Sequence, residues 1–129
     1  MKLFVITLNA LILGALSISC SSDDTLNQGV FAPCYEGLWK GIYIGEDTGN
    51  WNVSIDASGT IDGYLISDTN TVEFSIKGKM KDNQRFEASY YFNEQKVGDM
   101  HGTISSTSAV GEWSNTIQNL NGTWIGSKQ

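Results

Sequence analysis

Three residues of this 129-residue chain have side chains that often take part in chemistry: Cys20, Cys34 and the single histidine, His101. A cysteine beside a histidine can act as a nucleophile, and clusters of such residues can hold zinc. Cys34 and His101 lie far apart in the sequence, and one thiol with one histidine cannot complete a zinc site. The acidic residues lack calcium-loop spacing, and no nucleophile elbow, phosphate loop or dinucleotide fingerprint occurs. We therefore predict no catalytic residue, no metal and no cofactor, and expect that the protein is not an enzyme.

Residues 47–49 read Asp-Thr-Gly, the triplet in which aspartic proteases place their two proton-sharing aspartates. Those enzymes place the triplet after an apolar strand, whereas here Glu46 precedes it and the chain has to turn before Trp51. Aspartate and glycine are typical turn residues. We interpret Asp47 as part of a turn.

The N-terminal segment has the features of a secretory signal. Lys2 supplies a positive charge, and residues 3–16 are apolar apart from Thr7, Asn9 and small residues. A membrane-spanning helix needs about 20 apolar residues, whereas secretory signals are shorter and end at small residues. We predict that residues 1–19 are a signal peptide, cleaved before Cys20.

Cys20 and the residues before it resemble the lipobox of bacterial lipoproteins, with the small residue Ser19 next to the cysteine and Ser17 where leucine is common. In that family the cysteine becomes the acylated first residue of the mature chain. The following residues resemble the acidic export signal of surface lipoproteins in some Gram-negative bacteria. They are Ser21, Ser22, Asp23 and Asp24. Residues 24–26 also resemble an O-glycosylation acceptor, with Thr25 as its site.

The lipoprotein resemblance implies a protein of the outer membrane, lipid-anchored through Cys20 and exposed at the cell surface. Two alternatives stay open. An ordinary signal peptide would release a soluble periplasmic protein. In that oxidising compartment an unlipidated Cys20 could form a disulfide with Cys34.

Composition divides the mature chain into two parts. Residues 20–34 are rich in small and polar residues and contain the only proline, which predicts a flexible tether. Residues 35–129 suffice for one domain. The formal charge of the whole chain is −6, and loss of Lys2 with the signal makes it one unit more negative. We expect no nucleic-acid partner and no direct binding to anionic head groups.

Apolar and polar residues alternate along residues 35–129, with the period of two that half-buried strands show. The clearest case is residues 72–80, where Phe74, Ile76 and Met80 alternate with polar or charged residues. Similar runs recur between turn signals along the rest of the domain. The pattern predicts an all-β fold, an antiparallel up-and-down meander of about eight strands.

Several glycines share the inward face of these strands with large apolar residues, which favours a small closed barrel over a sandwich. They are Gly63, Gly78, Gly102, Gly111 and Gly122. Residues 37–41 (Gly-Leu-Trp-Lys-Gly) and 122–126 (Gly-Thr-Trp-Ile-Gly) are similar, so we expect the first and last strands to pair and close the sheet. The pattern leaves open whether Trp39 and Tyr43 or the aliphatic residues of the first strand face inward.

Residues 37–39, Gly-Leu-Trp, resemble the Gly-x-Trp of the first strand in lipocalins and related calycin barrels. The resemblance implies a lipocalin-like barrel able to hold a ligand, and it names no ligand. Avidin-like members place polar biotin contacts shortly after this tryptophan, where the present chain has Gly41. Biotin binding is therefore not implied.

The inward-facing aromatic residues are the best candidates for binding a ligand. We single out Trp39, Trp51, Tyr90, Trp113 and Trp124, and expect Phe74, Phe86 and Phe92 to point inward as well. An eight-stranded barrel is either filled by side chains or holds one small ligand, and we expect this one to be filled or nearly so. Tyr64 and Tyr91 point outward, where they could contact a glycan or a protein.

Taken together, the sequence predicts a membrane-anchored, noncatalytic binding module that takes a small apolar ligand, a glycan or a surface protein. The alternative is a barrel that inhibits a protease or another enzyme.

Overall fold

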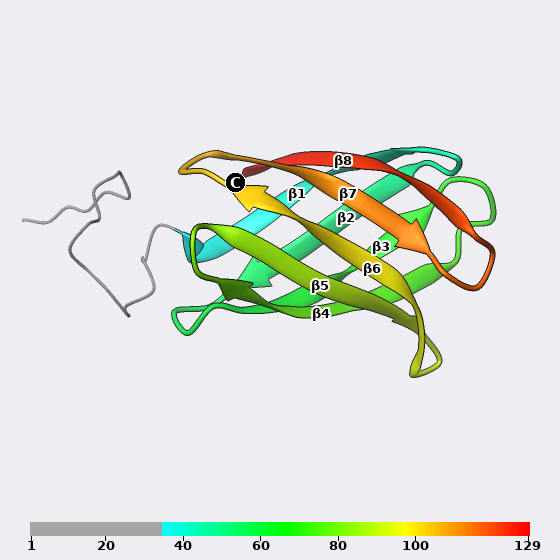
Figure 1. Ribbon diagram of the computed structural model, residues 1–129, viewed down its shortest axis with the longest axis horizontal. Helices are drawn as coiled ribbons and strands as arrows, with labels where there is room; N and C mark the ends of the chain where they lie inside the picture. Colours follow the sequence, from blue (N-terminus) through cyan, green and yellow to red (C-terminus); the bar gives the residue numbers. More distant parts are fainter. Residues whose placement is uncertain (1–34) are drawn as a thin grey trace, which may run out of the picture.

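A computed structural model describes residues 35–129 as eight antiparallel strands in chain order, which close into one barrel (Figure 1). The strands are β1 (Gly37–Gly45), β2 (Gly49–Ile55), β3 (Thr60–Ser67), β4 (Glu73–Lys81), β5 (Arg85–Phe92), β6 (Gln95–Ile104), β7 (Ser108–Asn115) and β8 (Leu120–Lys128). This confirms the predicted all-β meander and its closure. No helix among residues 35–129 is long and apolar enough to cross a membrane.

The alternation of inward and outward residues follows the sequence pattern in most strands. In β2, Trp51, Val53 and Ile55 are buried while the residues between them are more exposed. In β1 the register that the sequence left open is settled, because Trp39 and Tyr43 are buried and the aliphatic residues beside them point outward.

Closure is made by the pairing of β1 with β8, in which Gly41 lies opposite Gly126. A Cβ atom at Gly126 would overlap the indole ring of Trp51, and one at Gly111 would overlap the ring of Trp124. These glycines therefore provide the space that the two large rings fill. The sequence places inward glycines beside inward tryptophans because the missing glycine side chains leave room for the large rings in a closely packed core.

The core is built around interlocking aromatic rings. Trp124 contacts Trp51, with ring centroids 5.3 Å apart, and Phe86, at 5.0 Å. Trp39 is also fully buried, and its indole nitrogen donates a hydrogen bond of 3.0 Å to the carbonyl oxygen of Tyr35. Tyr35 is itself buried, so it covers this end of the core.

The barrel has two distinct ends. The entry end contains Tyr35, with which the described part begins, and the turns 56–59, 82–84 and 105–107. The distal end contains the segments 46–48, 68–72, 93–94 and 116–119. Because consecutive strands are antiparallel, every second connection lies at the same end. The described part of the chain therefore enters the barrel at the entry end, and the distal end lies opposite.

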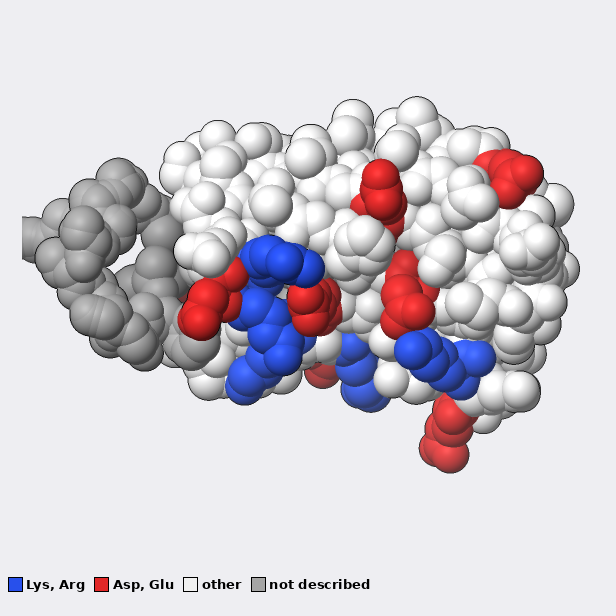
Figure 2. Space-filling model, in the orientation of Figure 1, with Lys and Arg blue, Asp and Glu red and all other residues white. Residues whose placement is uncertain are grey.

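Charged side chains are distributed unequally between the two ends. Most basic residues lie in the entry half or at its border, and they are Lys40, Lys77, Lys79, Lys81, Arg85 and Lys128. Within residues 35–129, Lys96 is the only lysine or arginine toward the distal end. Acidic residues of the distal half are Glu46, Asp47, Asp68, Glu73, Glu94, Asp99 and Glu112. Figure 2 shows a group of basic side chains toward the entry end on the face it displays, with acidic side chains among them.

One inward prediction was wrong. Phe92 is 45% exposed, although it packs beside Phe74 with ring centroids 5.9 Å apart. The pairing of β5 with β6 shifts register at Tyr90 and Tyr91, which leaves Val97 without a pairing partner on β5 and buried next to Gly98. This bulge interrupts the simple alternation, and Phe92 lies beyond it at the rim.

Candidate binding site at the distal mouth

The predicted site residues fall into three groups. Trp39, Trp51 and Trp124 lie in the packed interior, with at most 1% of their surface exposed. Trp113 and Tyr90 line a cavity at the distal end. The predicted lipidation, export and glycosylation residues lie outside the described residues. They are Cys20, Ser21, Ser22, Asp23, Asp24 and Thr25.

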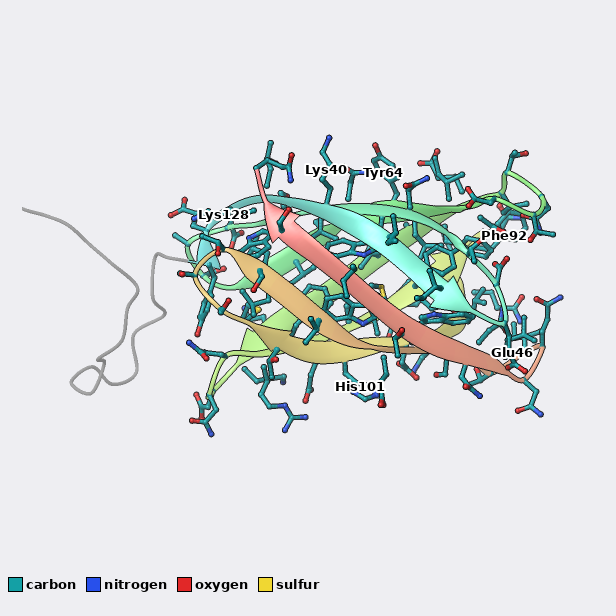
Figure 3. The ribbon with its side chains drawn as sticks, turned by 90° about the horizontal axis from the view of Figure 1, so that it is seen from above. Lys40, Glu46, Tyr64, Phe92, His101 and Lys128 are labelled. Atoms are coloured by element: carbon teal, nitrogen blue, oxygen red, sulfur yellow. The ribbon has the colours of Figure 1, made fainter. Side chains whose placement is uncertain are left out.

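The cavity at the distal end has a volume of about 20 Å³. Its lining consists of Tyr43, Asp47, Leu65, Phe74, Tyr90, Met100, Trp113 and Asn115. A volume of this size accommodates about one water molecule. The barrel is therefore nearly filled, and this small space at the mouth is where its interior approaches solvent. Phe92 and Glu46, labelled in Figure 3, lie at this distal end.

Aromatic rings form the walls of the mouth. Tyr43 and Trp113 meet edge to face with ring centroids 5.4 Å apart, and Phe74 and Tyr90 do so at 5.6 Å. The Trp113 indole nitrogen donates to the carbonyl oxygen of Ile44 at 2.9 Å. The Tyr90 hydroxyl donates to the carbonyl oxygen of Ser114 at 2.8 Å, so the polar atoms of both rings bind backbone. The rings are held in place, and their apolar surfaces line the cavity.

A cluster of hydrogen bonds on Asp47 organises the rim. Its carboxylate accepts from the Ser67 hydroxyl at 3.0 Å, the Thr69 hydroxyl at 2.8 Å and the Tyr43 hydroxyl at 3.4 Å. These contacts tie the segment between β1 and β2 to the segment between β3 and β4. Asp47 lies between strands, as interpreted from the sequence, but its side chain has this further role at the mouth.

Burial and charge keep the mouth tyrosines protonated. Burial, reinforced by the negative charge of Asp47, raises the pKa of Tyr43 to about 12. Burial also raises the pKa of Tyr90, with smaller contributions from Tyr43 and Asp47. Both hydroxyl groups are therefore hydrogen-bond donors over the whole physiological pH range.

The raised pKa of Tyr43 predicts a loss of stability in alkali. An unfolded tyrosine ionises near pH 10, so the folded state holds its proton longer and folding is disfavoured as the pH rises from about 10 to 12. Below pH 10 this contribution is fully present. We expect the urea midpoint to fall less steeply over this range in Tyr43→Phe than in the wild type. Tyr64→Phe, on the outer face, serves as the control and should retain the steep fall.

Sequence reasoning missed several residues of the mouth, namely Tyr43, Asp47, Ser67 and Asn115. Ser67 offered a usable signal, since it follows Leu65 on the inward face and is buried although polar. Polar residues at inward positions near a strand end often serve a partner, which here is Asp47. The position of Asp47 depends on how two turns meet, and alternation carries no information about that.

His101 lies on the outer face, with its Nε2 atom 4.0 Å from a carboxylate oxygen of Glu112. Among residues 35–129, no group of histidine, cysteine and acidic side chains is arranged to hold a metal ion.

No protein-family model, no curated protein and no solved structure matches the chain.

Proposed function

We propose that the protein is a membrane-anchored, noncatalytic lipoprotein whose barrel presents a small-molecule binding site at its distal mouth. The observation that carries this proposal is the position of the aromatic cavity at the end opposite Tyr35. An anchor at Cys20 precedes Tyr35 in the chain, so the mouth is at the end farther from the attachment. The proposed location is the outer surface of the outer membrane, with the periplasm as the alternative.

The lining of the mouth defines the class of ligand. Tyr43, Phe74 and Trp113 offer apolar ring surfaces, while Asp47 and Asn115 add polar atoms at one side. Ligand sites commonly combine an apolar lining with a few polar groups. The enclosed space takes only a group about the size of one water molecule, so the rest of the ligand lies on the aromatic rim. A small, mainly apolar molecule with one hydrogen-bond donor fits this arrangement.

The residues present support binding rather than catalysis. Asp47, the carboxylate at the mouth, already accepts hydrogen bonds from three hydroxyl groups, and Tyr43 and Tyr90 hold their protons tightly. His101 is on the outer face of the barrel. No group at the mouth within residues 35–129 is both basic near neutral pH and free to transfer a proton.

A ligand for the mouth is expected to raise the melting temperature. At a concentration of 100 times its dissociation constant, a ligand stabilises the folded state by about 2.7 kcal/mol. For a domain of this size that corresponds to a shift of roughly 10 °C or more. Screening small apolar molecules and glycans by thermal denaturation measures this shift.

Matched variants locate the site of any ligand found. Leu65→Phe places a larger side chain in the cavity and should reduce the shift strongly. Tyr64→Phe changes the neighbouring outward residue and should leave it intact. A shift that persists in Leu65→Phe and is lost in Tyr64→Phe would place the ligand on the outer surface and contradict the proposal.

A protein partner is the second candidate, favoured by an aliphatic strip on the outer face. Val110, Ile125 and Ile42 are successive cross-strand partners on β7, β8 and β1, and each is about half exposed. Contiguous exposed apolar residues often mark protein interfaces. A barrel that blocks a partner enzyme would use this strip rather than the mouth. Inhibition or binding that is lost in Ile125→Lys and kept in Leu65→Phe would favour this second function.

A further inference from the structure

We infer that the entry end of the barrel is a docking surface for anionic lipid head groups of the membrane that holds the chain. This inference rests on the proposed anchoring through Cys20. It adds an orientation, in which the entry end lies against the membrane and the distal mouth faces away from it.

The entry end carries basic side chains that can contact anionic head groups. Lys79 and Lys81 project from the outer face of β4, and Arg85 follows at the start of β5. Lys40 on β1 and Lys128 on β8 lie on another side of the same end (Figure 3). Basic residues therefore occur on more than one side of the entry end, as contact with a negatively charged plane requires.

Five acidic residues lie in the same half as the six basic ones, so its formal charge is close to +1, against a strongly negative distal half. They are Glu36, Asp56, Asp62, Asp82 and Glu87. Arg85 pairs with Glu87 at 2.9 Å, and Lys77 pairs with Asp62 at 3.5 Å. Both pairs are largely exposed to solvent, and exposed pairs are weak, so a phosphate group can compete for these cations. Lys81 makes no ion pair with any residue in the described part of the chain.

The overall negative charge of the chain, taken from the sequence alone, counts against binding to anionic lipids. The structure places most of the excess acid in the distal half, where Lys96 is the only basic residue of the described range. A nine-residue strand spans about 30 Å, whereas the Debye length at physiological salt is about 8 Å. Salt therefore screens the repulsion between the distal acids and the membrane. Basic side chains at the entry end contact the head groups within one Debye length, so their attraction is screened much less.

The chain also joins the barrel at the end that carries these basic residues. Tyr35 lies at the entry end, and residues 20–34 separate it from the proposed acylated cysteine. The sequence predicts a flexible tether over these residues, and a flexible chain of that length has a root-mean-square extension of about 20 Å. Such a tether keeps the entry end close to the lipid surface, so that even weak electrostatic contacts are populated. Each basic residue at an anionic surface favours contact by about fivefold.

The test uses the full chain, expressed in a host that processes lipoproteins and reconstituted into lipid vesicles. A fluorophore on Ser106→Cys, in the turn between β6 and β7, reports the entry end, with Cys34→Ser removing the second thiol. Lipids with a quencher on the head group then measure how often this end contacts the membrane. We expect stronger quenching in mixed phosphatidylcholine and phosphatidylglycerol vesicles than in phosphatidylcholine alone.

Two variants with the same change in net charge give the contrast. Lys79→Gln with Lys81→Gln should lower the contact equilibrium on anionic vesicles by on the order of tenfold. Lys96→Gln with Asn119→Asp removes one positive charge and adds one negative charge at the distal end, which gives the same change in net charge, and should leave the quenching unchanged.

The outcomes separate this inference from the proposed function. A chain that does not float with the vesicles contradicts the anchoring, and the inference falls with it. A chain that floats but is quenched equally in both vesicle types, or equally in both charge variants, overturns the inference and leaves the anchoring intact.

Discussion

Cys20→Ala is expected to abolish incorporation of labelled palmitate and to release the protein from the membrane fraction. The acyl chains of a lipoprotein are attached through this thiol, and each buried methylene contributes about 0.8 kcal/mol to membrane binding. One chain gives only reversible binding, whereas two or more give a stable anchor. Loss of the thiol is therefore expected to abolish stable membrane attachment rather than only weaken it.

Cys34→Ala is the matched control, because it removes the other cysteine of the chain and leaves the proposed lipidation site intact. Labelling and membrane fractionation should be unchanged in this variant. Labelling that persists in Cys20→Ala would contradict the anchor. A disulfide between Cys20 and Cys34, detected in the wild type by thiol titration under denaturing conditions, would contradict it as well.

Trp124→Ala is expected to lower the free energy of unfolding by about 3–5 kcal/mol, the usual cost of truncating a large buried aromatic residue. Trp124 is 1% exposed and contacts Trp51 and Phe86, and its indole nitrogen donates to the carbonyl oxygen of Glu112 at 3.0 Å. The substitution leaves a cavity among rings that cannot close it and removes the donor from that carbonyl. Since domains are stable by about 5–15 kcal/mol, the loss takes a large share of the total.

Ile125→Ala is the control on the same strand. Ile125 is 51% exposed on the outer face, so its truncation should change the free energy of unfolding by less than about 1 kcal/mol. Urea denaturation followed by circular dichroism measures both variants. A Trp124→Ala protein that is as stable as Ile125→Ala would show that the rings around Trp124 are not the core of the barrel.

The sequence predicted most of the barrel because its strands are half-buried and antiparallel. Alternation depends on two neighbouring residues facing opposite sides, so Trp51, Ile76 and Met100 could be assigned inward from the pattern alone. The similarity of the first and last strands predicted their pairing, which places Gly41 opposite Gly126. Alternation can be recognised within a single short segment, and each strand of the barrel repeats it.

The same pattern fails where the structure departs from regular pairing. The register shift at Tyr90 and Tyr91 buries Val97 and exposes Phe92, and a bulge of one residue leaves no clear mark in the sequence. In β1 both faces carry large apolar residues, so only the packed interior shows that Trp39 is inside.

The candidate site was predicted only in part for a similar reason. Trp113 and Tyr90 were named because they are inward and aromatic, and both line the mouth. Asp47 was seen as a turn residue, because its contacts with Ser67 and Thr69 join segments about 20 residues apart. Net charge also concealed the division between an entry half that holds most of the basic residues and a distal half with a large excess of acid, which depends on which turns lie at the same end of the barrel.

The central claim is that the distal mouth, and not the packed interior, binds a ligand. Titration of the protein with a ligand from the thermal screen, followed by tryptophan fluorescence, tests it most directly. Trp113 lines the mouth while Trp39 lies in the packed interior near the entry end, so the two indoles report different parts of the barrel. We predict a saturable change in emission that is lost in Trp113→Phe and kept in Trp39→Phe. No saturable change for any ligand, or a change that survives in Trp113→Phe and vanishes in Trp39→Phe, would contradict the claim.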